Sequence, residues 1–251
     1  MADSKIRRAV VTGASTGIGE ATVRQLRALG WEVTGVARRE ERLKKLAEET
    51  GCTYYAADLT DEGQVKAMAE YVESLGPVDA IVNDAGGALG VDSVADAVPD
   101  RWKTMYERNV ISALLVTDAF LPNMRKRGGD VLFLTSTAAH ATYPGGGGYV
   151  AAKHAERIIA NTMRLELVGE PVRVIEIAPG MVKTEEFSLH RLGSEEAAEN
   201  VYAGVEEPLS ADDVADAIVW TLTRPSHVNI DSLIIRPRAQ ASNTVVARDN
   251  R

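Results

Sequence analysis

The sequence predicts an α/β protein in which helices flank a doubly wound, seven-stranded parallel sheet. Strand-like and helix-like segments alternate about six times, as parallel strands and their crossover helices do. Several strand-like runs are continuously apolar, which is typical of a sheet that helices cover on both faces. No Pro- or Ser-rich linker and no change of composition divides the chain, so we expect residues 1–251 to form a single domain.

In the N-terminal half, apolar runs predict strands at 8–12, 32–37, 53–57 and 78–83, with helices between them at 17–29, 40–49 and 61–75. Gly30 and Gly51 stand just past the first two helices, where glycine favours termination. Asp61 can accept N–H bonds at the start of the third helix. Gly76-Pro77 breaks that helix before the fourth strand, because proline lacks the N–H that a helix interior uses.

In the C-terminal half, apolar runs predict strands at 131–136, 172–178 and 233–236, and helical patterns cover 100–126, 149–168 and 210–223. Gly128-Gly129 separates the first of these helices from the strand that follows it. Ser210 can cap the last helix, with Asp213 in the position that completes a capping box. These elements complete the alternation that a parallel sheet requires.

Two stretches do not fit this alternation. Residues 137–148 form a loop that ends in Pro144 and four glycines, and residues 181–209 form a long, charged insertion. A solvated helical hairpin would explain the charges of the insertion. We instead expect a lid that becomes ordered over a substrate, because long loops and mobile active-site segments often have that role. Lys183 and Arg191 are its permanent cations, and Arg191 is the candidate partner of a substrate carboxylate.

Composition indicates a soluble protein, with 45% apolar and 25% charged residues. The net charge of −8 leaves no basic footprint for nucleic acid. No apolar run approaches the ~20 residues that cross a bilayer. The single cysteine, Cys52, cannot form an internal disulfide, and no His/Cys cluster has zinc spacing. We therefore expect a cytoplasmic protein without a metal site.

The segment from Thr12 to Gly19 lies between a predicted strand and a predicted helix and has the spacing G-x-x-x-G-x-G. Glycine lets the backbone approach a pyrophosphate, and the helix N-terminus supplies free N–H groups. The segment lacks the Lys-Ser/Thr ending of a P-loop, which argues against a nucleotide triphosphatase. A tight turn without a ligand is the alternative. We expect six residues to bind a dinucleotide: Gly13, Ser15, Thr16, Gly17, Ile18 and Gly19.

The end of the second strand indicates which dinucleotide. NAD-dependent proteins place an acid here for the ribose hydroxyls, whereas this chain has Ala37 followed by Arg38 and Arg39. A guanidinium pairs with a phosphate through two parallel hydrogen bonds. We expect both arginines to bind the 2′-phosphate of NADP(H). The alternative is that they form the solvated start of the helix 40–49.

Polar residues also follow the third, fourth and fifth strands, at the sheet edge where such folds bind ligands. Asp58-Leu59 follows the third strand, and Asp58 can bond either an adenine amino group or its own loop. The fourth strand ends in Asn83-Asp84-Ala85-Gly86, and the fifth ends at Ser136.

The next predicted helix carries Tyr149 and Lys153, which share a face because they are four residues apart. A phenol titrates near ~10, and a nearby ammonium favours the phenolate. Ser136 can donate a hydrogen bond to a substrate oxygen. A surface tyrosine packed along a lysine stem is the alternative. The three residues together predict acid–base chemistry on an alcohol or a carbonyl.

Together these residues resemble the short-chain dehydrogenase/reductase family over essentially the whole chain, which implies a Rossmann fold and hydride transfer with NADP(H). The resemblance implies that Ser136, Tyr149 and Lys153 are catalytic and that Asn109 holds a proton-relay water. Asp84 stands where the family usually has asparagine. The resemblance also implies cofactor contacts at Asp58, Leu59, Asn83, Asp84, Ala85, Gly86, Tyr149, Lys153, Pro179, Gly180, Val182 and Thr184.

Within the family, segments 179–182, 184–187 and 225–230 look most like the NADP-dependent 3-hydroxy acid (serine-type) dehydrogenases. This likeness implies a small 3-hydroxy acid or serine-like substrate. Reduction of a 3-oxoacyl thioester or a specialised ketone stays open, as does a non-catalytic NADP-sensing role. The family usually forms dimers or tetramers, so we expect a homotetramer, with the tail 239–251 reaching a neighbouring subunit.

Overall fold

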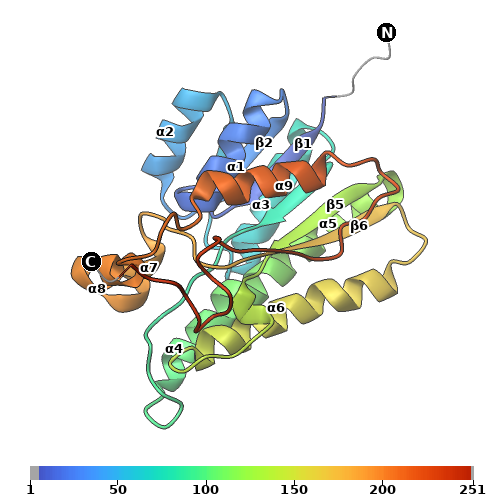
Figure 1. Ribbon diagram of the computed structural model, residues 1–251. Helices are drawn as coiled ribbons and strands as arrows, with labels where there is room; N and C mark the ends of the chain where they lie inside the picture. Colours follow the sequence, from blue (N-terminus) through green and yellow to red (C-terminus); the bar gives the residue numbers. More distant parts are fainter. Residues whose placement is uncertain (1–5, 250–251) are drawn as a thin grey trace.

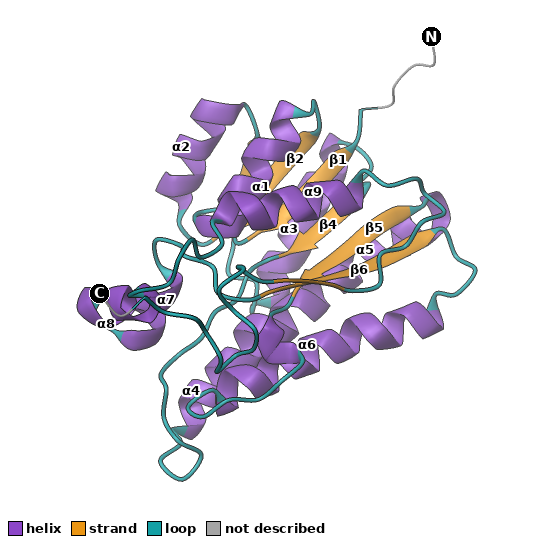
Figure 2. Cartoon of the chain, in the orientation of Figure 1, coloured by secondary structure: helices purple, strands orange, loops and turns teal. Residues whose placement is uncertain are grey.

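The computed structural model describes residues 6–249. One parallel sheet lies at its centre, with the strand order β3-β2-β1-β4-β5-β6-β7 (Figures 1 and 2). The predicted fold class is confirmed. The strand order reverses between β1 and β4, and such sheets bind ligands at the carboxyl ends of the strands beside that point. The strands are β1 (Arg8–Thr12), β2 (Glu32–Ala37), β3 (Thr53–Ala56), β4 (Ala80–Asn83), β5 (Gly129–Leu134), β6 (Val172–Pro179) and β7 (Leu233–Ile235).

Helices cover both faces of the sheet (Figure 2). Val10 and Val11 of β1 explain why the strands are apolar throughout, since both are fully buried but belong to opposite core clusters. Among the described residues, no helix is long and apolar enough to span a membrane. One layer contains α1 (Gly17–Ala28), α2 (Glu40–Thr50) and α9 (Ala211–Leu222), and the other contains α3 (Glu62–Leu75), α5 (Ser112–Arg127) and α6 (Gly147–Glu166).

The polar signals at the helix ends have the predicted local structure. Asp61 accepts a hydrogen bond from the backbone N–H of Gln64 at the start of α3. Ser210 and Asp213 form the predicted capping box of α9. Gly51 ends α2 with a φ of +68°, the left-handed conformation that glycine adopts without strain. These caps place the bounds of the three helices close to the predicted ones.

The predicted helix 100–126 is divided in the structure. It consists of α4 (Pro99–Tyr106), a π-helical turn (Glu107–Ile111) and α5. Within the turn, Asn109 Nδ2 donates to the carbonyl of Gly87 and to a carbonyl of the preceding helical turn. The π turn widens the helix locally, and the apolar periodicity of the sequence does not reveal it. Such turns often occur at functional sites.

The insertion 181–209 folds into two short helices, α7 (Phe187–Leu192) and α8 (Glu195–Tyr202). Its two ends meet, because Val182 and Leu209 form a parallel bridge. The segment is therefore a helical pair that is closed at its base. The helical hairpin expected as the simpler alternative is present, and its position decides whether it can also act as a lid.

The C-terminal tail packs on its own chain. Gln240 Oε1 accepts the backbone N–H of Met181, 2.7 Å away. Asn243 Nδ2 donates to the carbonyls of Thr137 and Ala141. The tail therefore holds both the start of the insertion and the loop after β5. A contact of the tail with a neighbouring subunit stays a prediction, and residues 250–251 lie outside the described part of the chain.

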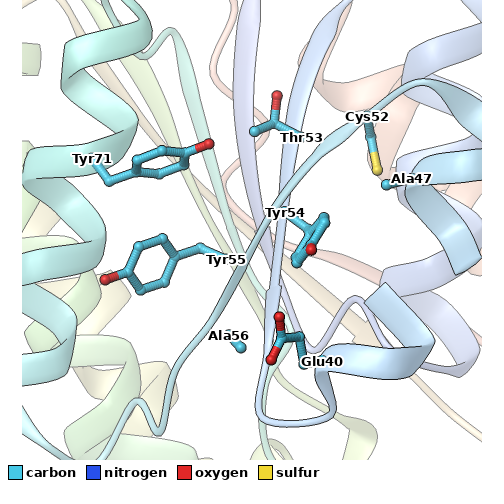
Figure 3. Close-up of a pocket in the computed structure, with 8 residues that line it drawn as sticks. All are labelled: Glu40, Ala47, Cys52, Thr53, Tyr54, Tyr55, Ala56 and Tyr71. Carbon is cyan, nitrogen blue, oxygen red and sulfur yellow. The ribbon is translucent and has the colours of Figure 1, made fainter. Parts of the chain in front are cut away.

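A groove runs along the edge strand β3 (Figure 3). Tyr55 lies beside Tyr71 of α3, with the ring centroids 5.3 Å apart. Tyr54 lies on the other side of the strand, toward Ala47 of α2. Alternating side chains of an edge strand leave this groove between the two helix layers. Its lining includes none of the predicted site residues, so the site is sought at the carboxyl ends of β1, β4 and β5.

Candidate active site

The end of β5 and the start of α6 bring the three predicted catalytic side chains together. Ser136 follows β5 and caps a short 3₁₀ turn, where its hydroxyl accepts the backbone N–H of Ala138. The same hydroxyl acts to lower the pKa of the Tyr149 phenol. Tyr149 and Lys153 both lie on the buried face of α6. Lys153 Nζ is 6.0 Å from the centre of the Tyr149 ring.

Lys153 has two hydrogen-bond partners among the described residues. Its Nζ donates to the carbonyl of Leu134 at 2.9 Å and to the carboxylate of Glu156 at 2.7 Å. An ammonium has three N–H donors, so one remains for a ligand. No motif in the sequence points to Glu156. The only signal for it is an acid three residues after Lys153 on the face predicted to be buried.

The pKa of the Tyr149 phenol is raised. Burial is the main cause, because the phenolate loses its hydration, while the Lys153 ammonium acts in the opposite direction. The effect of Lys153 thus has the predicted sign, but burial outweighs it here. At neutral pH the phenol is protonated, which is the form that can give a proton to a carbonyl oxygen.

Asn109 is fully buried where the π turn faces the loop after β4. A side chain at Gly86 would collide with Asn109 Oδ1, and Lys153 Nζ lies 3.6 Å from the same Cβ position. Glycine at position 86 therefore leaves the space between Asn109 and Lys153 open. This proximity is what a water-mediated link between the two side chains requires.

The loop between β1 and α1 has the features of a phosphate cradle. Gly13 and Gly17 have φ values of +68° and +58°. A Cβ on Gly19 would lie 2.6 Å from the carboxyl of Asp84. The Thr16 hydroxyl is buried and has no hydrogen-bond partner among the described residues. A glycine cradle at a helix N-terminus, with an unpaired buried hydroxyl, fits the pyrophosphate of a dinucleotide.

Asp84 holds this loop from the neighbouring strand. Its carboxylate lies against Gly19, where an added Cβ would be 2.6 Å from Asp84 Oδ2, and its own N–H donates to the hydroxyl of Thr12. Burial raises the pKa of Asp84 to about 7, although the Lys153 ammonium opposes the shift. Asn83 is buried behind it and donates to Thr117. An acid thus stands against the glycine loop at the position where the family usually has asparagine.

Arg39 lies at the glycine loop. Its guanidinium donates to the hydroxyl of Ser15 at 2.9 and 3.2 Å and to the carboxylate of Glu186 at 2.6 Å. Arg42 reaches the same carboxylate at 2.9 Å. Arg38 is exposed. The predicted 2′-phosphate site is therefore joined to the insertion through Glu186, a contact that no local sequence pattern indicates.

Asp58 makes hydrogen bonds within its own loop. Its Oδ1 accepts the backbone N–H and the hydroxyl of Thr60, and these bonds lower the pKa of Asp58. Leu59 is buried beside it. These are the local bonds expected as the alternative to an adenine contact, and the adenine contact itself stays a prediction.

The segment after β6 leads from Ser136 to the glycine loop. The carbonyl of Pro179 lies 3.5 Å from the hydroxyl of Ser136. Farther along, Thr184 lies 3.5 Å from the position that a Cβ of Gly17 would occupy. The segment between Pro179 and Thr184 thus passes both parts of the site, as a strip of cofactor contacts would.

The insertion lies against Tyr149. The ring of Phe187 packs edge-on against Tyr149, with centroids 5.8 Å apart. The Arg191 guanidinium lies 6.0 Å from the Tyr149 ring centre and 5.5 Å from that of Tyr143. Lys183 instead lies against a tyrosine of α8. The insertion thus places Phe187 and Arg191 beside Tyr149, and its closure over a substrate stays a prediction.

A doubly wound sheet, a glycine cradle and a Ser–Tyr–Lys set at one sheet edge define a dinucleotide-binding protein of the Rossmann type. The family model described as short chain dehydrogenase matches residues 7–192. The chain belongs to this family, and the resemblance noted in the sequence is confirmed.

Similarity to individual relatives indicates the branch of the family that the chain resembles. It is 52% identical to an uncharacterised oxidoreductase of Mycobacterium tuberculosis over 94% of this chain and 93% of the relative. It is 41% identical to the serine 3-dehydrogenase of Agrobacterium fabrum over 92% of this chain and 94% of that protein. It is 37% identical to an NADP-dependent 3-hydroxy acid dehydrogenase of Escherichia coli over 92% of this chain and 95% of that protein. A closed form of serine dehydrogenase complexed with NADP+ has a TM-score of 0.91 at 33% identity, covering 96% of this chain and 99% of that one. The predicted branch of the family is confirmed.

Proposed function

We propose that the chain is an NADP-dependent oxidoreductase that interconverts a secondary alcohol and a carbonyl in a small 3-hydroxy acid or serine-like compound. The observation that carries the proposal is Tyr149, buried beside the Lys153 ammonium on α6, with the Arg191 guanidinium 6.0 Å from the centre of the Tyr149 ring. The serine- and 3-hydroxy acid-dehydrogenase relatives, and the NADP+ complex of the similar structure, support the cofactor and the substrate class.

The chemistry that NADP(H) supplies when bound is transfer of a hydride to or from the substrate carbon. In alcohol oxidation the Tyr149 phenolate takes the hydroxyl proton, and in reduction the phenol returns it. Ser136 donates a hydrogen bond to the reacting oxygen. Lys153 stabilises the phenolate by its charge and donates its remaining N–H to the cofactor ribose. Asn109 holds a water through which Lys153 exchanges protons with solvent.

Arg191 supports a substrate that carries a carboxylate. In a 3-hydroxy acid a single carbon separates the carboxylate from the reacting, hydroxyl-bearing carbon. The cation that binds this carboxylate therefore has to lie beside the acid–base group. Arg191 occupies that place, and its guanidinium can bind a carboxylate through two hydrogen bonds. A turnover screen with NADP and NAD against 3-hydroxy acids, serine isomers and small aldehydes tests the proposal. Reduction or oxidation of uncharged compounds alone would contradict the substrate class.

We expect NADP to be preferred over NAD. The contact of Arg39 with Ser15 places a guanidinium at the glycine loop, where a 2′-phosphate can replace Glu186 as its partner. A charged contact of this kind is worth ~1.5–3 kcal/mol, or about tenfold to a hundredfold in affinity. Arg39→Gln should raise the KM for NADP by that factor and leave the KM for NAD nearly unchanged, as measured by steady-state kinetics. Lys45→Gln, at an exposed position of α2, the helix that follows Arg39, is the control. Equal use of both cofactors by the unaltered protein would refute the prediction.

We propose a homotetramer, and the free cysteine fits the expected cytoplasmic location. Leu114 of α5 and Ile158 and Leu165 of α6 expose 45, 57 and 79% of their surface, although they lie on well-packed helices. Burial of such patches against a second copy would stabilise an assembly. Light scattering at micromolar concentration should give a multiple of the monomer mass. The double substitution Leu114→Glu/Ile158→Glu should reduce that mass, and a monomer in the unaltered protein would rule out the assembly.

A further inference from the structure

A buried acid stands directly behind the lysine of the site. Glu156 follows Lys153 by three residues on α6, and its Oε2 lies 2.7 Å from Lys153 Nζ. The side chains of the two residues are 1% and 5% exposed. The other carboxylate oxygen, Oε1, is buried and has no hydrogen-bond partner among the described residues. Among the described residues, the hydrogen bond to Lys153 is therefore the one that holds the Glu156 carboxylate in place.

Helix geometry places the ammonium between two groups. Tyr149 precedes Lys153 by four residues and Glu156 follows it by three, so all three side chains lie along one face of α6. A buried ion pair is expensive to form unless its partners are well oriented, and it adds little stability for its desolvation cost. A pair kept at this place therefore calls for an explanation other than stability.

The charges explain what the pair does to the phenol. Burial alone would lower the pKa of Lys153, yet that pKa stands above its ordinary value, chiefly because the Glu156 carboxylate stabilises the ammonium. The same carboxylate raises the pKa of Tyr149, against the effect of Lys153. Burial raises the pKa of Glu156 itself to about 7 in spite of the lysine.

We propose that Glu156 is a positioning residue that fixes the Lys153 ammonium and cancels part of its charge, so that Tyr149 faces an ion pair instead of a lone cation. An ion pair stabilises a phenolate less than a lone ammonium does. The Tyr149 hydroxyl is then held in its protonated form, which is the proton donor for carbonyl reduction. This inference rests on the proposed function and adds that the site is tuned toward reduction near neutral pH.

Other charged groups around this trio are accounted for. Asp84 faces Lys153 from the loop after β4, and Glu176 faces Glu156 from β6. Glu176 is itself held by Thr135 and His140, with Arg157 at 3.8 Å. Tyr143 and Arg191 face Tyr149 from the loop before α6 and from α7. None of these groups contacts Lys153 Nζ as closely as Glu156 does among the described contacts, so Glu156 is the residue to change.

The test is the titration of Tyr149 in Glu156→Gln, which keeps the shape of the side chain and removes its charge. Nuclear magnetic resonance of ring-labelled tyrosine follows the phenol directly, and Tyr149→Phe identifies its signal. We expect the midpoint of the Tyr149 titration to fall by about one pH unit, a tenfold change in the phenol–phenolate ratio. The pH profile of kcat/KM for alcohol oxidation should move by the same amount. Glu166→Gln, exposed near the end of α6, should change neither.

Each other outcome overturns the proposal. An unchanged midpoint in a folded Glu156→Gln protein would make Glu156 structural only. A rise of the midpoint would mean that Glu156 acts by keeping Lys153 protonated. If Glu156→Gln does not fold, Glu156→Asp replaces it, because its carboxylate lies farther from Lys153. The midpoint of the Tyr149 titration should then change, and an unchanged midpoint contradicts the proposal as well. Because the titration needs no turnover, it separates failure of this inference from failure of the proposed function.

Discussion

Tyr149→Phe should lower turnover by ~100-fold or more, because it removes the group that takes or gives the substrate proton. The substitution changes little volume, and the ring contact with Phe187 at 5.8 Å is kept. Binding of NADP should stay near normal, since the glycine loop and Arg39 are untouched. Steady-state kinetics and a fluorescence titration with NADPH measure the two effects separately.

Tyr71→Phe is the matched control for this substitution. Tyr71 lies in the groove beside β3, and its ring contacts Tyr55 instead of any residue of the candidate site. It should leave both kcat and NADPH binding unchanged. Undiminished turnover in Tyr149→Phe would remove Tyr149 from the mechanism. Equal losses in both variants would point to destabilisation.

The second large effect is expected at Arg191. Arg191→Ala should raise the KM for a 3-hydroxy acid by about tenfold to a hundredfold, because it removes a charged hydrogen-bond partner of the carboxylate. The KM for an uncharged alcohol of similar size should change little. The comparison of the two substrates in one variant isolates the charge from any general damage to the lid.

Arg224→Ala is the control for Arg191→Ala. Its guanidinium also lies over an aromatic ring, 4.8 Å from the centre of Trp220 on α9, a helix outside the insertion. It should affect neither substrate. If Arg191→Ala raises both KM values alike, Arg191 only supports the lid and the substrate carboxylate is bound elsewhere.

Local signals account for the parts of the structure that the sequence predicts well. The apolar runs are strands because burial on both faces leaves no polar positions, as Val10 and Val11 illustrate. Parallel strands also end at one edge, so residues that follow different strands, such as Ser136 and Asp84, could be assigned to one site before the structure was known. The helical spacing of Tyr149 and Lys153 placed them on one face.

The remaining features depend on contacts between distant segments. Glu186 meets Arg39 across 147 positions of the chain, and Asn243 meets Thr137 across 106. No local pattern reports such pairs. The π turn at Asn109 is stabilised by hydrogen bonds between the side chain of that residue and the backbone of Gly87. Apolar periodicity does not report these bonds, and it therefore predicts an unbroken helix there.

The most direct test of the central claim follows the hydride itself. A 3-hydroxy acid with deuterium on its hydroxyl-bearing carbon is incubated with the protein and NADP+, and the NADPH formed is analysed by mass spectrometry. With the unaltered protein, we expect each NADPH formed to carry one deuterium, and we expect Tyr149→Phe to form ~100-fold less labelled NADPH in the same time. NADPH without the label, or labelled NADPH formed equally fast by Tyr149→Phe, would contradict tyrosine-assisted hydride transfer at this site.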